Sequence, residues 1–194
     1  MNWLCRSTDC FSQAQYEAAY AQLSPSRKTR IDRLHRATDK RRSLAGEILA
    51  KELAAQFGVC SPVIEATEAG QPVFQNCDLF LSIAHCKNQV ACVVDTQPVG
   101  IDIEFLHPFR PGLLRHVCTQ EEAEFVLNGY DAGEYEVTDP AVISRFFEIW
   151  TAKEAWFKMV GTGITNLRSV DVLSARRQIF RQDGYMIQII KGSR

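Results

Sequence analysis

The chain has 194 residues, of which 46% are hydrophobic and 23% are charged, and its formal net charge is −1. It is long enough to bury a sizeable core, and its near-neutral charge argues against a protein that coats nucleic acid or a membrane surface. No apolar run reaches membrane length, and the N-terminus lacks a signal-peptide pattern. We therefore expect a cytoplasmic protein.

Seven cysteines are present, and no two of them form a C-x-x-C pair. Because the number is odd and a core of this size needs no covalent staples, we expect free thiols in a reducing compartment. The seven are Cys5, Cys10, Cys60, Cys77, Cys86, Cys92 and Cys118.

The N-terminal part of the chain predicts one strand followed by helices. Residues 1–8 are strand-like, and residues 12–23 predict a short helix. Ser24 and Pro25 have the cap-then-proline order that begins a second helix. Apolar side chains then recur at helical spacing over residues 43–57, which predicts a long amphipathic helix.

A basic run spans residues 27–42, with eight Lys or Arg against two acidic residues, while the rest of the chain holds 14 basic and 21 acidic residues. Like charges at this density repel one another unless an anion lies nearby. The run therefore indicates a site for an anionic small ligand. A solvated basic helix face remains the alternative.

Short strands follow the helices. Residues 68–72 predict a turn, and residues 79–84 and 90–95 predict two strands. His85 comes directly after the first of these strands, where a lone histidine is more often structural than functional.

The next predicted strand, residues 99–104, has the sequence VGIDIE. Strand alternation sends Asp102 and Glu104 to one face and Ile101 and Ile103 to the other. Two carboxylates therefore share one face of a strand whose other face is apolar.

Asp139 and Pro140 begin a long helix, again in the cap-then-proline order. Helical spacing predicts one face that carries Lys153, Glu154 and Lys158. Taken alone, Glu154 and Lys158 would be a surface ion pair. Together with the two strand carboxylates, Glu154 completes a set of oxygen ligands suited to a hard cation.

The remaining segments connect and complete these elements. Residues 105–117 contain two prolines and predict an irregular, exposed path, and residues 119–127 predict a helix with a capping box. Residues 169–173 alternate like a strand, and residues 178–181 and 185–190 predict a hairpin.

These elements predict an α+β fold of two similar lobes related by a pseudo-twofold. Each lobe is expected to be a small antiparallel sheet packed on a long helix. The N-terminal lobe is residues 1–98, the C-terminal lobe is residues 99–194, and the active site is expected at their junction.

A divalent cation, helix lysines and an arginine-rich segment suit phosphoryl-type transfer, in which charge on phosphate oxygens must be neutralised. Neither GxxxxGK[ST] nor GxGxxG occurs, so an ordinary P-loop protein is not expected.

The VGIDIE strand, followed about fifty residues later by WTAKEA at residues 150–155 and by Lys158, resembles the paired motif of the 4′-phosphopantetheinyl transferases, specifically the Sfp type with a W/KEA motif. Residues 23–46 resemble the basic N-terminal segment of that family. Residues 70–72 resemble its G-K-P turn, and residues 81–86 its N-x-S-H-S strand end. The likeness covers residues 23–172.

The resemblance implies transfer of the 4′-phosphopantetheine arm of coenzyme A to a serine of an acyl or peptidyl carrier protein, with release of adenosine 3′,5′-bisphosphate. It implies Mg²⁺ bound by Asp102, Glu104 and Glu154, with Glu154 taking the serine proton and Lys158 assisting the departing phosphate. The positions matching the family's coenzyme A contacts are Arg27, Arg30, Arg42, Ser43, Gln71, Pro72, His85, Lys153 and Lys158.

The chain departs from the family pattern in three places. Gln71 replaces the usual lysine of the turn, and Ala84 and Cys86 replace two serines that flank His85. The chain also ends at Arg194, soon after the predicted hairpin, where longer relatives continue with further strands.

The carrier protein is expected to dock on residues 105–117 of a monomer, because carriers of this class are commonly acidic and the segment interleaves apolar and cationic side chains. The predicted docking residues are Phe105, Phe109, Arg110, Leu114 and Arg115. Two other readings of the acidic strand and helix remain open, namely a metal-dependent nuclease and a non-catalytic coenzyme A-binding protein.

Overall fold

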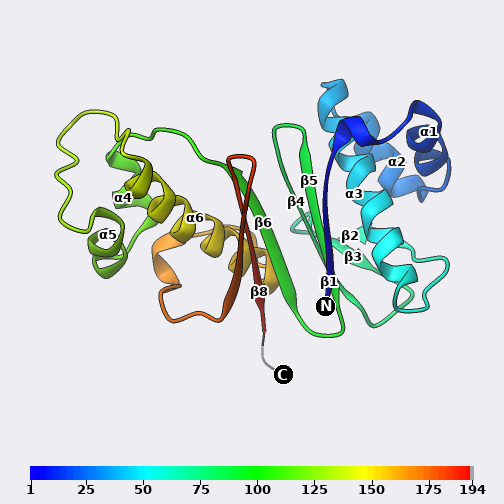
Figure 1. Cartoon of the computed structure of the whole chain (residues 1–194). Helices are drawn as coiled ribbons and strands as arrows, with labels where there is room; N and C mark the ends of the chain where they lie inside the picture. The colour runs from blue at the N-terminus through cyan, green and yellow to red at the C-terminus, as the bar shows by residue number, and fades with distance from the viewer. Residues whose placement is uncertain (193–194) are drawn as a thin grey trace.

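The computed structural model describes residues 1–192, so Ser193 and Arg194 at the end of the predicted C-terminal lobe lie outside the described residues. The chain forms two halves that meet along strands β4 and β6 (Figure 1). The first half contains β1 (Asn2–Ser7), α1 (Gln13–Ala21), α2 (Pro25–Asp32), α3 (Ala37–Ala55), β2 (Ile64–Ala66), β3 (Pro72–Phe74), β4 (Phe80–Cys86) and β5 (Gln89–Asp95). The second contains β6 (Val99–Phe105), α4 (Gly112–Val117), α5 (Gln120–Leu127), α6 (Pro140–Val160), β7 (Arg177–Gln182) and β8 (Tyr185–Lys191).

The first half is an antiparallel sheet in the order β1-β5-β4 with α3 packed against it. The predicted helix starts are confirmed: Ser12 caps α1 in a capping box, and Ser24 caps α2 with Pro25 at its first turn. Helix α3 begins at Ala37, six residues before the apolar repeat, because charged residues continue a helix without contributing to its apolar face. Arg42 therefore lies in its second turn.

The predicted turn at residues 68–72 joins β2 to β3, a separate two-stranded sheet. Gly70 has φ +85°, a left-handed backbone that glycine adopts without steric cost. The hairpin carries Gln71 toward the second half of the molecule.

The second half is an antiparallel sheet in the order β6-β8-β7, covered by α6. Asp139 caps α6 by accepting hydrogen bonds from the backbone N–H groups of Ala141 and Val142, as the cap-then-proline order predicts. Thr119 caps α5 in the predicted capping box. The turn between β7 and β8 has Asp183 and Gly184 both at positive φ, which confirms the predicted hairpin.

Two predictions for the second half are wrong. Residues 112–117 form helix α4 rather than an irregular path, because Leu114 and Val117, three residues apart, enter the core on one helical face. Residues 169–173 form no strand. Their alternation arises because Val170 and Val172 are buried, while the Val172 N–H donates to the Glu122 carboxylate instead of to a neighbouring strand.

The two sheets pack against each other through a buried apolar cluster that includes Val93, Ile101 and Ile187. Ile101 and Ile103 point into this cluster, so Asp102 and Glu104 point to the other face, as the alternation predicts. All seven cysteines are free thiols. No helix among residues 1–192 is both long and apolar enough to cross a membrane.

Candidate active site

The site begins with an unusually close contact between strand β6 and helix α6. A Cβ added at Gly100 would overlap the backbone oxygen of Ala155 and lie 2.7 Å from the backbone N of Met159. Only a glycine lets the two backbones approach this closely. The contact places the acidic face of β6 against the α6 turn that carries Glu154 and Lys158.

Lys158 and Asp102 form the shortest charged contact in this site. The Lys158 Nζ lies 2.6 Å from Asp102 Oδ1. Asp102 is 4% exposed, and its second oxygen, Oδ2, is buried without a hydrogen-bond partner. A buried carboxylate oxygen without a donor is costly, so this oxygen indicates room for a further cation or donor.

Glu154 and Glu104 lie close enough to Asp102 for its charge to change their pKa values. Burial and the Asp102 charge, opposed by Lys158, raise the pKa of Glu154 to about 7. Burial, followed by the Asp102 charge, also raises the pKa of Glu104 above its usual value. The three carboxylates therefore repel one another across a site that contains one ammonium group.

As the side chains stand, no group of three or more His, Cys, Asp or Glu residues within residues 1–192 is gathered tightly enough to hold a metal ion. The three carboxylates share a site without converging on one point. Their mutual repulsion is a physical reason for this spacing.

Lys153 does not lie on the face of α6 that carries Glu154 and Lys158, so that prediction is wrong. Its ammonium lies 2.5 Å from the Glu122 carboxylate of α5 and donates to the Leu167 carbonyl, and both charged side chains are fully buried. Because the Lys153 ammonium is buried against Glu122 and Leu167, a contact between Lys153 and coenzyme A is not supported.

The predicted basic contacts have different surroundings. Arg27 is 7% exposed and pairs with Glu47, at 2.6 Å, inside the first half. Arg42 remains at the surface, where it pairs with Asp39 and donates to the Lys87 carbonyl. Of these two arginines, only Arg42 is placed to reach a ligand at the surface.

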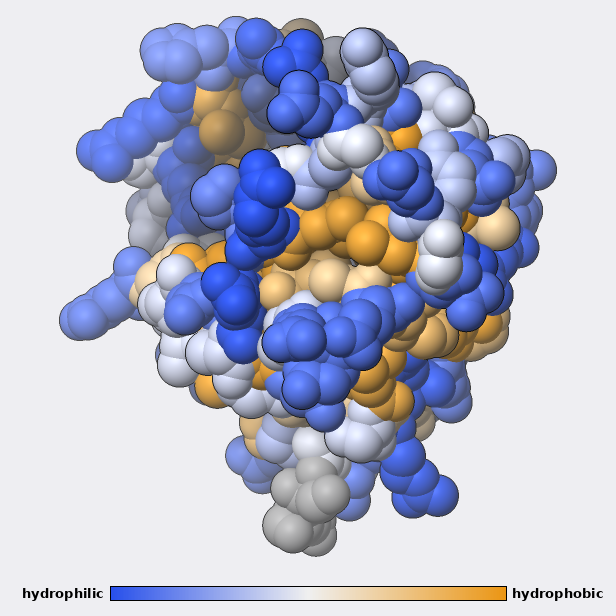
Figure 2. All heavy atoms as spheres, turned by 90° about the vertical axis from the view of Figure 1, so that its left-hand side faces the viewer, coloured by the Kyte–Doolittle hydropathy of each residue, from blue (hydrophilic) through white to orange (hydrophobic). Residues whose placement is uncertain are grey.

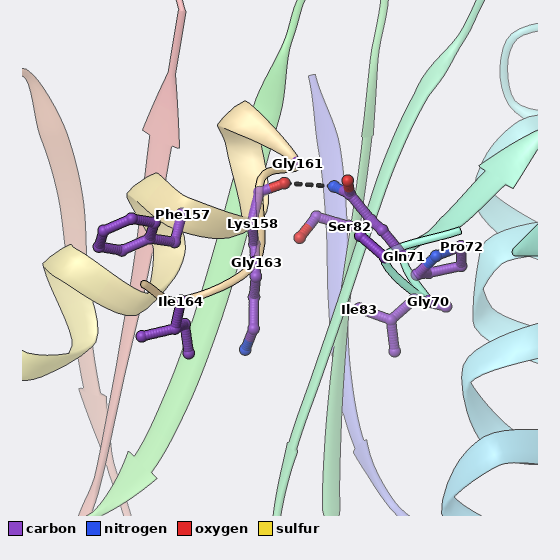
Figure 3. Close-up of a pocket in the computed structure, with 11 residues that line it drawn as sticks. Gly70, Gln71, Pro72, Ser82, Ile83, Phe157, Lys158, Gly161, Gly163 and Ile164 are labelled. Atoms are coloured by element: carbon purple, nitrogen blue, oxygen red, sulfur yellow. Dashed lines mark hydrogen bonds between the residues drawn. The ribbon is translucent and has the colours of Figure 1, made fainter. Parts of the chain in front are cut away.

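A cavity of about 260 Å³ lies between the β2–β3 hairpin and the end of α6 (Figure 3). In this view Gln71 extends from the hairpin to the helix, and its Nε2 donates to the backbone carbonyl of Lys158. Pro72 and Ile83 line the same cavity. The cavity is bounded by both halves, with Lys158 in its wall.

Three other predicted contacts lie outside the lining of this cavity. Arg30 packs against Gly70 of the hairpin, and Ser43 is half-buried on α3. His85 is exposed at the end of β4, where partial burial and the nearby Arg42 charge lower the pKa of its imidazole.

The predicted docking segment is only partly exposed. Phe109 and Leu114 are buried, and the Phe109 ring stacks on Phe146 at 4.0 Å, so their prediction as exposed anchors is wrong. Both side chains complete the apolar core beneath α6. Arg110 and Arg115 remain exposed.

Phe105 is half-buried, with the Lys87 ammonium 2.9 Å from its ring centroid. The end of the molecule that carries α4 and α5 shows an apolar area framed by hydrophilic side chains (Figure 2). A cavity of about 550 Å³ at α4 and α5 is lined in part by Leu114, Arg115 and Leu127.

Sequence reasoning missed two residues that organise this region. Ser82, buried on β4, accepts a hydrogen bond from the Ile101 N–H, and Glu122 is the partner of Lys153. The capping box identified Glu122 as a helix-start residue, but its second role depends on a contact 31 positions away in sequence. The alternation of β4 was the available signal for Ser82.

Comparison with known proteins identifies a family and several relatives to which this chain is similar. Residues 98–189 match the family model of the 4′-phosphopantetheinyl transferase superfamily. The chain is 27% identical over 177 residues to 4′-phosphopantetheinyl transferase Sfp of Bacillus subtilis, covering 89% of this chain and 73% of that protein. It is 27% identical over 170 residues to 4′-phosphopantetheinyl transferase HetI of a Nostoc species, covering 82% and 68% of the two chains.

A third relative, 4′-phosphopantetheinyl transferase psf-1 of Bacillus pumilus, is 28% identical over 158 residues, covering 79% of this chain and 64% of that protein. The chain is thus similar to the 4′-phosphopantetheinyl transferase superfamily over residues 98–189 and to named transferases over most of its length, and these similarities support an enzyme of the transferase class. The resemblance recognised in its motifs is thereby confirmed.

Proposed function

We propose that this protein transfers the 4′-phosphopantetheine group of coenzyme A to a serine of an acyl or peptidyl carrier protein, in a reaction that requires Mg²⁺. The observation that carries the proposal is the Asp102 carboxylate. One of its oxygens pairs with Lys158 and the other is buried without a partner, beside two further carboxylates whose pKa values are raised.

The chemistry of these residues suits a divalent cation, and the three carboxylates would draw together to hold it. Asp102, Glu104 and Glu154 would hold Mg²⁺, and the unpaired Asp102 Oδ2 supplies the ligand atom that most needs a positive partner. When bound, Mg²⁺ neutralises negative charge on phosphate oxygens. The ammonium of Lys158, 2.6 Å from the same carboxylate, indicates that positive charge is already favoured there.

In the proposed reaction, the carrier serine Oγ forms a bond to the phosphorus that bears the pantetheine arm. The bond between that phosphorus and the bridging oxygen of the pyrophosphate breaks, and adenosine 3′,5′-bisphosphate leaves. Glu154, with a pKa raised to about 7, is suited to accept the serine proton near neutral pH. Lys158 would neutralise the departing phosphate.

Coenzyme A would lie in the cleft between the halves. The surface residues Arg42 and His85, the Arg30 side chain beside Gly70, and the cavity at Gln71 and Pro72 support this position. Ser43, half-buried near Arg42 on α3, remains in the proposed set. Arg27 instead has a structural partner in Glu47.

The proposed lobes are residues 1–98 and 99–194. Their support is that both sheets have the same order, with the first strand of the half beside its last strand and the next-to-last strand outside. A long helix, α3 or α6, packs on each sheet. The acidic face of β6 lies at the junction, which is where we place the active site of a monomer.

The carrier would dock on the exposed cations Arg110 and Arg115 and on Phe105. The change Arg115→Glu should then slow association with an acidic carrier at low salt and leave coenzyme A binding unchanged. Equal carrier kinetics in parent and variant at low salt would place the carrier on another face.

Intact-mass spectrometry tests the central proposal. An apo carrier incubated with this protein, coenzyme A and Mg²⁺ should gain one phosphopantetheine arm, and Asp102→Ala or Glu154→Gln should abolish the gain. Glu134→Gln, an exposed loop change, serves as the control and should keep activity. Coenzyme A binding without a mass gain would contradict transfer, and cleavage of added nucleic acid would favour a nuclease.

A further inference from the structure

Strand β4 presents a row of small side chains to the edge of β6. Ser82, Ala84 and Cys86 alternate along β4 and therefore share one face. The Ser82 Oγ accepts a hydrogen bond from the Ile101 N–H at 3.1 Å, and the Cys86 Sγ accepts one from the Phe105 N–H at 3.3 Å. From the first contact to the second, the β4 residue and the β6 residue each move four positions toward the C-terminus, so the two strands run parallel. Side chains of β4, instead of its backbone, bond to the β6 backbone.

Cys86 makes a second contact that Ser82 does not make. Its Sγ lies 3.6 Å from Glu104 Oε2, within the range of a thiol donating to a carboxylate. The same sulfur thus contacts the backbone of Phe105 and the side chain of Glu104. One half-buried thiol on the first half of the chain fixes two consecutive residues of the second half.

The Glu104 carboxylate needs such a partner because the charges around it push it away. Asp102 lies two positions away on the same face of β6, so like charge is close to Glu104, and the Lys158 ammonium is already paired with Asp102. A half-exposed carboxylate in this position gains by turning toward water unless a donor holds it. The Cys86 thiol is placed to be one such donor, beside the Trp150 indole.

We infer that Cys86 is a positioning residue that holds the Glu104 carboxylate toward the cation site, so that the site depends on a side chain from the opposite half of the molecule. This role rests on the proposed function, in which Glu104 is a metal ligand. Groups that orient metal ligands commonly contribute strongly to metal affinity. The contact also makes metal binding sensitive to the packing of β4 on β6.

A positioning role for Cys86 can be distinguished from a purely structural role by experiment. If the thiol only joined the two strands, its loss would lower the melting temperature without changing the Mg²⁺ concentration at which the protein responds. If it holds Glu104, its loss raises that concentration, and a hydroxyl in the same position restores it.

The test compares Cys86→Ala and Cys86→Ser with the parent protein. The readout is the Mg²⁺ concentration that gives half of the maximal rise in melting temperature, with transfer to an apo carrier measured alongside. Cys86→Ala should raise this concentration by about 10-fold, the lower end for groups that orient a metal ligand, because a thiol is a weak donor. Cys86→Ser should return it to within about twofold of the parent, since a hydroxyl donates at least as well.

Cys5→Ala is the matched control, because Cys5 is a half-buried thiol on β1 whose hydrogen bond goes to Gln89 and not to Glu104 or the β6 backbone. It should leave the Mg²⁺ response unchanged. A second readout is hydrogen exchange of the Phe105 amide, which should become faster in Cys86→Ala and return to the parent rate in Cys86→Ser.

The possible failures differ from one another. A Cys86→Ala protein with the parent Mg²⁺ response would overturn the role of Cys86 alone. If Mg²⁺ changes neither the melting temperature nor the activity of the parent protein, the metal site itself is contradicted. The proposed role of Cys86 then fails with it. Unchanged exchange of the Phe105 amide would show that Cys86 does not hold β6.

Discussion

The basic segment of the first half and the acidic cluster of the second half differ in how many of their charges have a partner of opposite charge. In the basic segment, Arg27 pairs with Glu47 in the interior and Arg42 pairs with Asp39 at the surface. In the acidic cluster, Asp102, Glu104 and Glu154 share the single ammonium of Lys158.

The difference shows which region is electrostatically complete without a ligand. The arginines that pair internally contribute to the fold whether or not an anion is bound. The carboxylates carry repulsion that only an added cation or proton relieves. Changes in the two regions should therefore separate stability from ligand binding.

The largest loss of stability is expected from Lys153→Met, which lies beside the acidic cluster in sequence but belongs to the core. Removing the ammonium leaves the Glu122 carboxylate buried and unpaired, which should cost about 3–5 kcal/mol. Denaturant unfolding measures this change. The double variant Lys153→Met with Glu122→Gln should recover part of the loss. If Lys153→Met alone is as stable as the parent, the Lys153–Glu122 pair does not contribute to stability.

A loss of about 3 kcal/mol is expected from Gly100→Ala, because the added Cβ would overlap the α6 backbone and drive β6 from the helix. Transfer activity should fall with stability, since Asp102 moves away from Lys158. Gly129→Ala offers a control with no atom within 4 Å of the added Cβ, although its φ of +82° also carries strain. Melting curves and activity for both variants check the prediction, and a fully active Gly100→Ala protein would refute it.

Arg27→Met and Arg42→Ala should give contrasting results within the basic segment. Arg27→Met leaves Glu47 buried without its partner and should destabilise the protein by about 3 kcal/mol. Arg42→Ala removes a surface pair and should change stability by less than about 1 kcal/mol, while raising the KM for coenzyme A. Unfolding curves and steady-state kinetics separate the two. If Arg27→Met keeps the parent stability and only raises the KM for coenzyme A, the Arg27–Glu47 pair does not stabilise the fold and Arg27 binds the ligand instead.

The smallest effect is expected from pH in metal-free protein. Glu154 has an unfolded-state pKa near 4.5 and a folded-state pKa of about 7, so the folded state binds more protons between these values. Stability from this group is present below pH 4.5 and is lost as pH rises through about 7. Melting temperature should therefore fall by a few degrees across this window. The fall should be reduced in Glu154→Gln and by added Mg²⁺. An identical pH profile in the variant would exclude Glu154 as the source.

Local features of this protein could be predicted from its sequence because neighbouring residues decide them. Ser12, Thr119 and Asp139 cap their helices through contacts within three residues, and the Asp183-Gly184 turn adopts the left-handed conformations that its residue types favour. Strand alternation likewise placed Asp102 and Glu104 on one face. These predictions needed no information about distant parts of the chain.

Only the tertiary structure decided which side chains meet across the molecule. Helical spacing cannot reveal that Lys153 turns toward Glu122, because the partner is set by how α5 packs on α6. The burial of Phe109 and the contact between Cys86 and Glu104 depend in the same way on which surfaces the folded elements cover. A carboxylate or a thiol has the same sequence signal in a core as in a cleft, and only the packing of elements distant in sequence distinguishes the two.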